Sequence, residues 1–377
     1  MDDSKSKRMK ILQLLHSLNT GGAEILAERF GRNFTRNYEV IFACLDGVGE
    51  IGERLLKDGF RVVELQRKDG IDRNCIKRLK HLIRNESVDL IHAHQYTPFF
   101  YAMAAQAIGR RKPILFTEHG RFLPDLPSHK RIFFNRLMLR KRDHIVAVGK
   151  DVKRALIENE GLPDSRIDVI YNGIPIDRFN TNSTNAKQQF FRESLGIPKS
   201  ASVVVQVARL DYLKDHVTAV KALSLATQQT DIHLVIVGEG PERNKIENEI
   251  REQQIADRVH LVGLRNDIPD ILREADILLL TSISEVIPLT LIEGMATGLP
   301  VVSTDVGGVA EVIRENESGF LCSAQDHKTI ATRLATLTQS KELRRQFGEN
   351  GKARAEANFS EKAMQKKYDA LVSQMLQ

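Results

Sequence analysis

The sequence predicts an α/β protein of two doubly wound, Rossmann-like domains that face a central cleft. Three observations support this fold class. The 377 residues exceed the size of one ordinary domain. Short apolar, β-branched runs alternate with longer amphipathic stretches, as in a parallel sheet covered by helices. This alternation starts again after a polar segment at residues 180–194.

Each series contains five expected strands, assigned from their length and from the glycines and polar residues that bound them. The first series has strands at residues 10–15, 38–44, 88–91, 113–117 and 144–148. The second has strands at residues 203–207, 233–237, 259–262, 277–280 and 300–303. We expect one domain at 1–180, a second at 181–359, and a helix at 360–377 that packs back on the first.

The composition excludes several classes of protein. Hydrophobic residues make up 42% and charged residues 28%, which is typical of a globular chain and not of a disordered one. No stretch approaches the roughly 20 apolar residues that a membrane-spanning helix needs. The three cysteines are far apart and include no CxxC pair, so we expect neither a disulfide framework nor a zinc site. These features predict a cytoplasmic protein.

Positive charge is concentrated in the first half of the chain. Residues 1–180 hold 32 Lys and Arg against 23 Asp and Glu, and the remaining residues hold 23 against 26. A basic half suggests an anionic partner, either nucleic acid or a membrane surface, although an ordinary solvated surface explains it equally well. No stacking or groove-reading motif supports nucleic acid, so we expect no such partner.

Part of this charge lies in an expected amphipathic helix at residues 130–142. It combines six basic residues with Phe133, Phe134, Leu137 and Met138 and has no acidic residue. Such a helix can lie on the inner face of an anionic membrane as a peripheral contact. Alternatively, its apolar side packs on its own domain.

Two features of the first series favour a binding site at the carboxyl ends of its strands. The first strand ends in a turn at residues 17–24 whose two glycines allow backbone to approach a ligand, although it lacks the G-x-G-x-x-G fingerprint of dinucleotide binding. His119 follows the fourth strand, where it can bind a sugar hydroxyl or transfer a proton. His119 could also be a structural histidine.

His92 and His94 follow the expected strand at 88–91, on one face of the extended chain. They could be a metal pair, but no third ligand accompanies them at metal-ligand spacing. We therefore expect polar contacts lining a cleft.

The second series carries the strongest pattern. Arg209 and Lys214 flank a loop after its first strand, and two cations there suit a diphosphate. Glu285 precedes an expected helix and Glu293 lies in its second turn, so two carboxylates bracket a helix N-terminus that favours phosphate. Carboxylates accept hydrogen bonds from paired sugar hydroxyls. Singly, these residues could equally be ordinary surface charges.

Taken in order along the full length of the chain, these motifs resemble glycosyltransferase family 4, a large group of retaining enzymes with the GT-B fold. The residues that carry the resemblance are Gly21–Glu24, His92, His94, Thr117–Gly120, Tyr171–Ile174, Arg178, Phe179, Arg209, Lys214, Gly238–Pro241, Glu285, Glu293, Gly307, Gly308 and Glu311. One departure is that Val286 stands where the family usually has glycine.

The resemblance implies that the first domain is on the acceptor side and that the second binds a UDP- or GDP-sugar. It implies that Arg209 and Lys214 contact the diphosphate, Glu293 the ribose, Glu285 the transferred sugar, and His119 the sugar or acceptor. The donor-binding set that it implies is Gly22, Arg209, Lys214, Gly238, Glu285, Ile287, Pro288, Leu289, Thr290 and Glu293.

The expected reaction is retaining transfer of a sugar to a glycan or lipid-linked acceptor, as in cell-surface polysaccharide or lipopolysaccharide synthesis. We expect no metal and no cofactor, because the two cations can stabilise the leaving diphosphate and the chain has no Asp-x-Asp. Alternatives are a sugar-nucleotide epimerase or a phosphorylase of the same fold. A nucleotide-binding paralogue without transferase activity is a further alternative, because of Val286.

Overall fold

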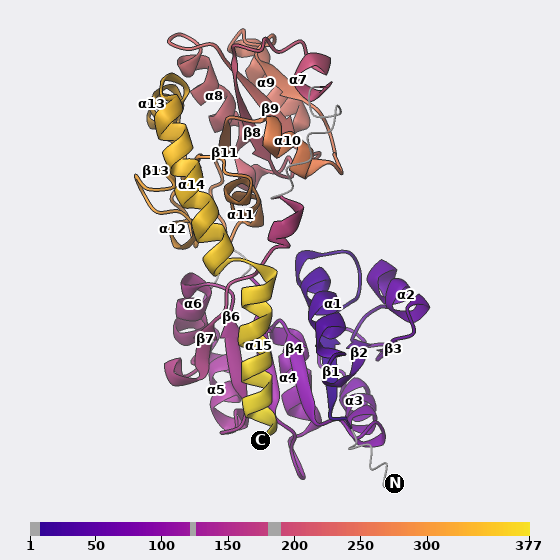
Figure 1. Cartoon of the computed structure of the whole chain (residues 1–377). Coiled ribbons are helices and arrows are strands. Elements are labelled where there is room, and N and C mark those ends of the chain that lie inside the picture. Colours follow the sequence, from indigo (N-terminus) through magenta and orange to yellow (C-terminus); the bar gives the residue numbers. More distant parts are fainter. Residues whose placement is uncertain (1–7, 121–125, 180–189) are drawn as a thin grey trace. The chain divides into compact units, whose positions relative to one another are not determined.

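A computed structural model describes residues 8–120, 126–179 and 190–377. The chain divides into two compact units (Figure 1). Unit 1 contains the chain up to Ile170 together with Gln365–Gln377, and unit 2 contains Tyr171–Met364. The domain boundary expected at residues 180 and 181 lies outside the described residues.

Unit 1 is built on a parallel sheet, and its described residues form seven strands in the order β3-β2-β1-β4-β5-β6-β7. Because β1 lies between β2 and β4, the direction of winding reverses beside it, and such switch points are where ligands bind. The strands are β1 Lys10–Leu15, β2 Glu39–Cys44, β3 Arg61–Glu64, β4 Leu90–His94, β5 Ile114–Glu118, β6 His144–Ala147 and β7 Ile167–Val169.

Helices connect these strands, as a parallel sheet requires. They are α1 Gly22–Phe34, α2 Gly49–Lys57, α3 Arg73–Asn85, α4 Tyr96–Ala105, α5 His129–Met138 and α6 Lys150–Glu160. The C-terminal helix α15, Glu361–Leu376, joins unit 1 from Gln365 onward. The ring centroid of its Tyr368 lies 4.4 Å from that of Phe30 in α1, with the two rings tilted by 45°. The Tyr368 hydroxyl lies 3.3 Å from Thr117 Oγ1.

Unit 2 repeats the arrangement with a six-stranded parallel sheet in its described residues, ordered β10-β9-β8-β11-β12-β13. The winding reverses between β8 and β11. The strands are β8 Ser202–Val207, β9 Ile232–Val237, β10 Val259–Leu261, β11 Ile277–Leu280, β12 Val301–Thr304 and β13 Gly319–Cys322. The two parallel, doubly wound sheets confirm the predicted fold class.

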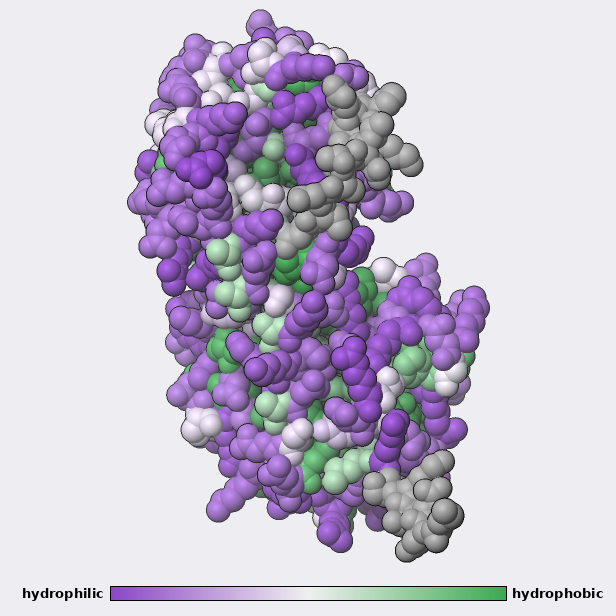
Figure 2. Space-filling view, viewed as in Figure 1, coloured by the Kyte–Doolittle hydropathy of each residue, from purple (hydrophilic) through white to green (hydrophobic). Residues whose placement is uncertain are grey.

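The helices of unit 2 cover both faces of its sheet. They are α7 Phe190–Ser194, α8 His216–Ala226, α9 Arg243–Glu252, α10 Ile268–Glu274, α11 Leu289–Ala296, α12 Val309–Val312, α13 His327–Gln339 and α14 Lys341–Asn358. Successive residues of β8 show why. Val203 and Val205 belong to one apolar cluster and Val204 to another, so both faces of this strand are buried. The visible outer surface is mostly hydrophilic (Figure 2).

Several strand assignments need correction. β4 spans Leu90–His94 and not 88–91, so His92 and His94 lie within the strand and not after it. Three strands were missed, namely β3, β7 and β13. β7 has only three residues, and β3 is an edge strand whose side chains are all at least partly exposed, so neither produces a long apolar run.

Candidate active site

Two of the predicted site residues, Lys214 and Glu285, form an ion pair in unit 2. Lys214 ends a short 3₁₀ turn after β8, and Glu285 lies between β11 and α11. Lys214 Nζ donates to Glu285 Oε1 at 2.6 Å, and the Ser282 hydroxyl donates to the same oxygen at 2.6 Å. The Glu285 side chain is 8% exposed and that of Lys214 is 26% exposed. The fold therefore joins a cation and a carboxylate from two loops beside the switch point.

Buried polar side chains hold these two loops together. Thr281 Oγ1 lies 3.1 Å from the Lys214 carbonyl oxygen and 2.9 Å from that of Asp215, and its hydroxyl can donate to either. Gln206, inside β8, donates from its amide nitrogen to Thr281 Oγ1 at 3.0 Å. The backbone nitrogen of Ile283 also donates to the Leu213 carbonyl at 2.9 Å. Lys214 is therefore fixed through its backbone.

Glycines allow other segments to pack directly against the backbone of the loops that carry Lys214 and Glu285. Gly307 has a φ of +53°, and a Cβ there would lie 1.8 Å from the Glu285 carbonyl oxygen. A Cβ on Gly308 would lie 2.0 Å from the Val286 carbonyl oxygen. Gly238 directly follows β9, and a Cβ there would lie 2.0 Å from the Ala208 carbonyl oxygen. Only glycine permits these backbone contacts.

Arg209, the second predicted diphosphate ligand, lies on the same loop as Lys214 but points largely into solvent. Its side chain is 73% exposed, and its Nε lies 4.0 Å from Asp211 Oδ2. Asp211 also accepts a hydrogen bond from the backbone nitrogen of Leu213 at 3.0 Å. Because its ion pair is long and exposed, the Arg209 guanidinium can turn to an anion at little cost.

The remaining predicted donor residues lie at the start of α11. Ile287 and Pro288 are buried before the helix, and Leu289 and Thr290 are its first two residues, both partly buried. Glu293 lies in the second turn and is also partly buried. As expected from the sequence, Glu285 and Glu293 lie on either side of the helix N-terminus.

The unusual Val286 adopts ordinary backbone geometry. It is absent from the described non-glycine residues with positive φ, so its side chain fits without left-handed strain. The side chain packs against the apolar cluster beneath α11. The backbone here therefore does not require glycine.

In unit 1, His119 follows β5 at the carboxyl edge of the sheet. Its Nε2 lies 2.9 Å from His94 Nδ1, and its Nδ1 is buried without a hydrogen-bond partner among the described residues. Burial lowers the pKa of His119 to about 4, so its imidazole is neutral at pH 7. Gly22 is the first residue of α1, and a Cβ there would meet nothing within 4 Å.

His92 and His94 do not line a cleft, in contrast to the expectation. Both side chains are buried in β4, with ring centroids 4.1 Å apart. Burial lowers the pKa of each well below its usual value. Within the described ranges, no group of three or more His, Cys, Asp or Glu residues is arranged to hold a metal ion.

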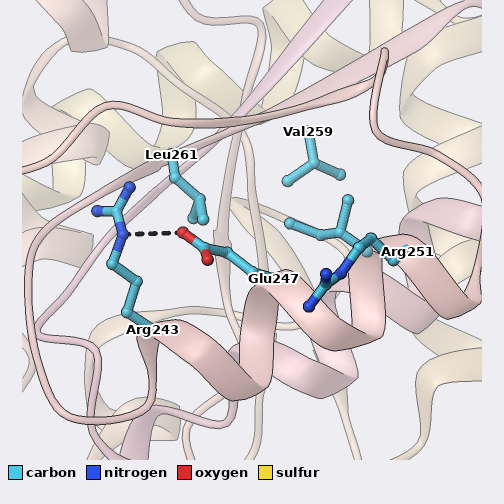
Figure 3. A pocket seen from close by; sticks show the side chains of 6 residues that line it. Arg243, Glu247, Arg251, Val259 and Leu261 are labelled. Atoms are coloured by element: carbon cyan, nitrogen blue, oxygen red, sulfur yellow. Dashed lines mark hydrogen bonds and ion pairs between the residues drawn. The ribbon is translucent and has the colours of Figure 1, made fainter.

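A separate pocket of unit 2 contains none of the predicted residues. It lies between α9 and β10, and Figure 3 shows its lining residues: Arg243, Glu247, Ile250, Arg251, Val259 and Leu261. Arg243 is held on two sides, because its Nε donates to Glu247 Oε1 and its Nη1 to Glu239 Oε1, both at 2.9 Å. Both arginines of the pocket therefore already have partners, because Arg251 donates to Asn248 Oδ1.

The sequence analysis missed the polar residues that support the site. Gln13, Gln206, Thr281 and Ser282 are all fully buried. For Gln13 and Gln206 a signal was available, since each is a polar residue inside an otherwise apolar strand. A buried amide needs hydrogen-bond partners, so such a position marks a polar contact in the core.

The doubly wound units define the GT-B fold of glycosyltransferases, as solved structures show. A glycosyltransferase from Rickettsia africae superposes with a TM-score of 0.86 over 98% of this chain and 99% of that one, at 24% identity. Anabaena HepE, solved in complex with UDP, gives a TM-score of 0.85 over 97% of this chain and 100% of its own, at 22% identity.

Two family models match the sequence, one in each half. The model described as "Glycosyltransferase Family 4" matches residues 20–178, and the one described as "Glycosyl transferases group 1" matches residues 187–354. A Bacillus anthracis relative, N-acetyl-alpha-D-glucosaminyl L-malate synthase, is 28% identical over 79% of this chain and 78% of its own length. The chain belongs to glycosyltransferase family 4 and is a transferase.

An Escherichia coli relative is also similar over most of its length. It is UDP-Gal:alpha-D-GlcNAc-diphosphoundecaprenol alpha-1,3-galactosyltransferase, 24% identical over 72% of both chains. Within the part of this chain that the structure describes, no helix has the length and apolar character needed to span a membrane.

Proposed function

We propose that this protein transfers a sugar from a UDP- or GDP-sugar, with retention of configuration, to a glycan or lipid-linked acceptor. The observation that carries the proposal is the Lys214–Glu285 pair beside the switch point of unit 2. It offers a cation for the diphosphate and a carboxylate for sugar hydroxyls at one place. The UDP and UDP-glucose complexes of HepE support the choice of donor.

Each donor group then has a proposed partner in unit 2. Lys214 and Arg209 bind the diphosphate, Glu293 the ribose and Glu285 the transferred sugar. In the free protein Lys214 pairs with Glu285, so the arriving diphosphate shares this lysine with the carboxylate. The N-terminus of α11 adds partial positive charge. These charges offset the leaving diphosphate without a metal ion.

The proposed reaction exchanges one bond for another at the anomeric carbon. The bond from this carbon to the β-phosphate oxygen breaks, and the leaving diphosphate takes the electron pair. The acceptor oxygen bonds to the same face of the carbon, and its proton passes to a phosphate oxygen. We propose that His119 contacts the sugar or the acceptor, and that Gly22 and Gly238 line the substrate site.

Relatives support a role in cell-surface polysaccharide or lipopolysaccharide synthesis. The Escherichia coli relative named above acts on a diphosphoundecaprenol-linked sugar. Another relative, EpsF of Bacillus subtilis, is named a putative glycosyltransferase and is 25% identical over 80% of this chain. A lipid-linked acceptor would place this protein at the inner face of a membrane.

The exposed side of α5 supports peripheral membrane contact. Phe133 is 71% exposed and Leu137 is 66% exposed, so these two apolar side chains do not pack on unit 1. They lie one helical turn apart, and Lys130 and Arg136 of the same helix are also exposed. Apolar and basic side chains together suit an anionic lipid surface. The helix ends at Met138, four residues earlier than expected.

We expect the double variant Phe133→Ser, Leu137→Ser to bind anionic vesicles at least tenfold more weakly than the wild type. Burying one such side chain is worth about 1.5–3 kcal/mol. The measurement is cosedimentation with phosphatidylglycerol-containing vesicles. The matched control is Leu56→Ser, Ile71→Ser, which removes two other exposed apolar side chains of unit 1. Equal binding by both double variants, or no binding by the wild type, would contradict membrane contact through α5.

The donor proposal is tested by calorimetric titration with UDP, GDP and ADP without divalent metal. We expect UDP or GDP to bind, and Arg209→Ala to weaken that binding about tenfold, because a charge-assisted hydrogen bond is worth about 1.5–3 kcal/mol. Arg345→Ala, which removes an exposed arginine of α14, should leave it unchanged. Absence of binding to all three nucleotides would refute the nucleotide-sugar donor.

Product analysis then separates the enzymatic alternatives. Transfer to an acceptor with the donor's anomeric configuration supports the proposal. A changed sugar nucleotide would indicate an epimerase, a sugar phosphate would indicate a phosphorylase, and binding without turnover would indicate an inactive paralogue.

A further inference from the structure

A chain of three polar side chains crosses the buried centre of unit 1. Gln13 comes from β1, His94 from β4, and His119 follows β5, and these strands are neighbours in the sheet. Gln13 Oε1 lies 2.7 Å from His94 Nε2, and His94 Nδ1 lies 2.9 Å from His119 Nε2. The imidazoles of His94 and His119 are stacked, with an interplanar angle of 16°.

With the Gln13 amide oxygen toward His94, the hydrogen-bond geometry of this chain assigns a position to each proton. An amide oxygen can only accept, so His94 Nε2 carries a hydrogen and donates it to Gln13. In a neutral imidazole the other nitrogen is then an acceptor, so His94 Nδ1 accepts from His119 Nε2. By the same rule His119 Nδ1 has no hydrogen and presents a lone pair. The amide oxygen of Gln13 thus sets, through two successive hydrogen bonds, whether His119 Nδ1 carries a hydrogen.

Burial supports the neutral state that this reasoning requires. Gln13 and His94 are fully buried, and desolvation keeps the pKa values of His94 and His119 below neutral pH. His119 Nδ1, at the outer end of the chain, is buried with no partner among the described residues. A buried polar atom without a partner is rare, because leaving it unpaired costs about 1–3 kcal/mol. A ligand hydroxyl would satisfy it.

We propose that Gln13 and His94 are positioning residues that hold His119 with its proton on Nε2, so that Nδ1 meets a substrate only as a hydrogen-bond acceptor. This inference rests on the proposed function for the identity of the substrate, a sugar or acceptor hydroxyl. It goes further because it states which partner donates the hydrogen bond in that contact. His119 binds a group that carries a hydrogen, and it does not donate a proton from Nδ1.

The first test is nuclear magnetic resonance of the full-length protein labelled with ¹⁵N-histidine, which distinguishes protonated from bare ring nitrogens. The variant His119→Gln identifies the His119 signals by their loss. We expect Nδ1 bare and Nε2 protonated in the wild type. We expect a mixture of tautomers in Gln13→Met, which removes the accepting oxygen while keeping a side chain of similar length.

Thr117→Val is the matched control for loss of a buried polar contact. Thr117 is a fully buried residue of β5 whose hydroxyl lies 2.9 Å from His92 Nε2, outside the Gln13 chain. We expect the His119 signals to be unchanged in this variant. A wild-type His119 protonated on Nδ1, or identical His119 signals in Gln13→Met and the wild type, would overturn the inference. No substrate is needed, so failure of the proposed function would not affect this result.

A kinetic test follows if transferase activity is found. Gln13→Met should lower kcat/KM about tenfold, because one tautomer of the mixture has no acceptor at Nδ1. In a His119→Gln background the same substitution should cause no further loss, since interacting residues are not additive. Additive losses in the double variant would show that Gln13 acts through stability alone and would overturn its positioning role.

Discussion

Replacing Lys214 with methionine is expected to lower kcat/KM by about 10²–10³-fold, the usual loss when one preorganised group that stabilises transition-state charge is removed. Methionine keeps most of the length of the side chain but has no positive charge. The leaving diphosphate would lose a partner that lies 2.6 Å from Glu285 in the free protein. Steady-state kinetics measures the loss of activity. Calorimetric titration with the nucleoside diphosphate measures the loss of binding.

The matched control is Lys245→Met in the same unit. Lys245 is an exposed lysine of α9 that pairs with Glu242 at 2.9 Å. Its replacement should leave kcat/KM within about twofold, because an exposed ion pair is worth about 0–1 kcal/mol. Lys214→Arg retains the charge and should recover part of the activity. If Lys214→Met folds normally and keeps full activity, Lys214 does not stabilise the leaving group.

The fold was predictable because its central strands are mostly apolar and are buried on both faces. β1, β9 and β11 begin and end within one residue of the expected bounds. The strands that sequence analysis missed have no such run. Gly319–Cys322 of β13 begins with a glycine, a residue depleted in strands, so only three apolar residues mark it.

The roles of single residues in the site were less predictable. Glycine turns and charged residues at strand ends pointed to Arg209, Lys214 and Glu285, because loops at the carboxyl edge of parallel strands converge. The ion pair between Lys214 and Glu285 could not be predicted, since it joins loops 71 residues apart. His94 was misplaced because β4 continues past Ile91 with alternating histidines and alanine, which carry no apolar signal.

Replacing Gly307 with alanine is expected to lower kcat/KM by about 10²-fold, because a displacement of about 1 Å in a catalytic site can have that effect. A Cβ at this position would lie 1.8 Å from the carbonyl oxygen of Glu285, and backbone on both sides leaves no flexible group to move away. The backbone at Gly307 or the loop that holds Glu285 must therefore shift, and we expect this to disturb the contact between Glu285 and Lys214. Kinetics together with thermal unfolding measure the effect.

Gly196→Ala separates this displacement from backbone strain. Gly196 also lies in unit 2 and has a φ of +68°, but a Cβ there would meet nothing within 4 Å. Both variants bear the left-handed strain of about 1–2 kcal/mol that alanine introduces, so both should unfold at a lower temperature. Only Gly307→Ala should lose activity while still folded. Equal activity of the two variants would mean that the contact between Gly307 and Glu285 does not hold the catalytic geometry.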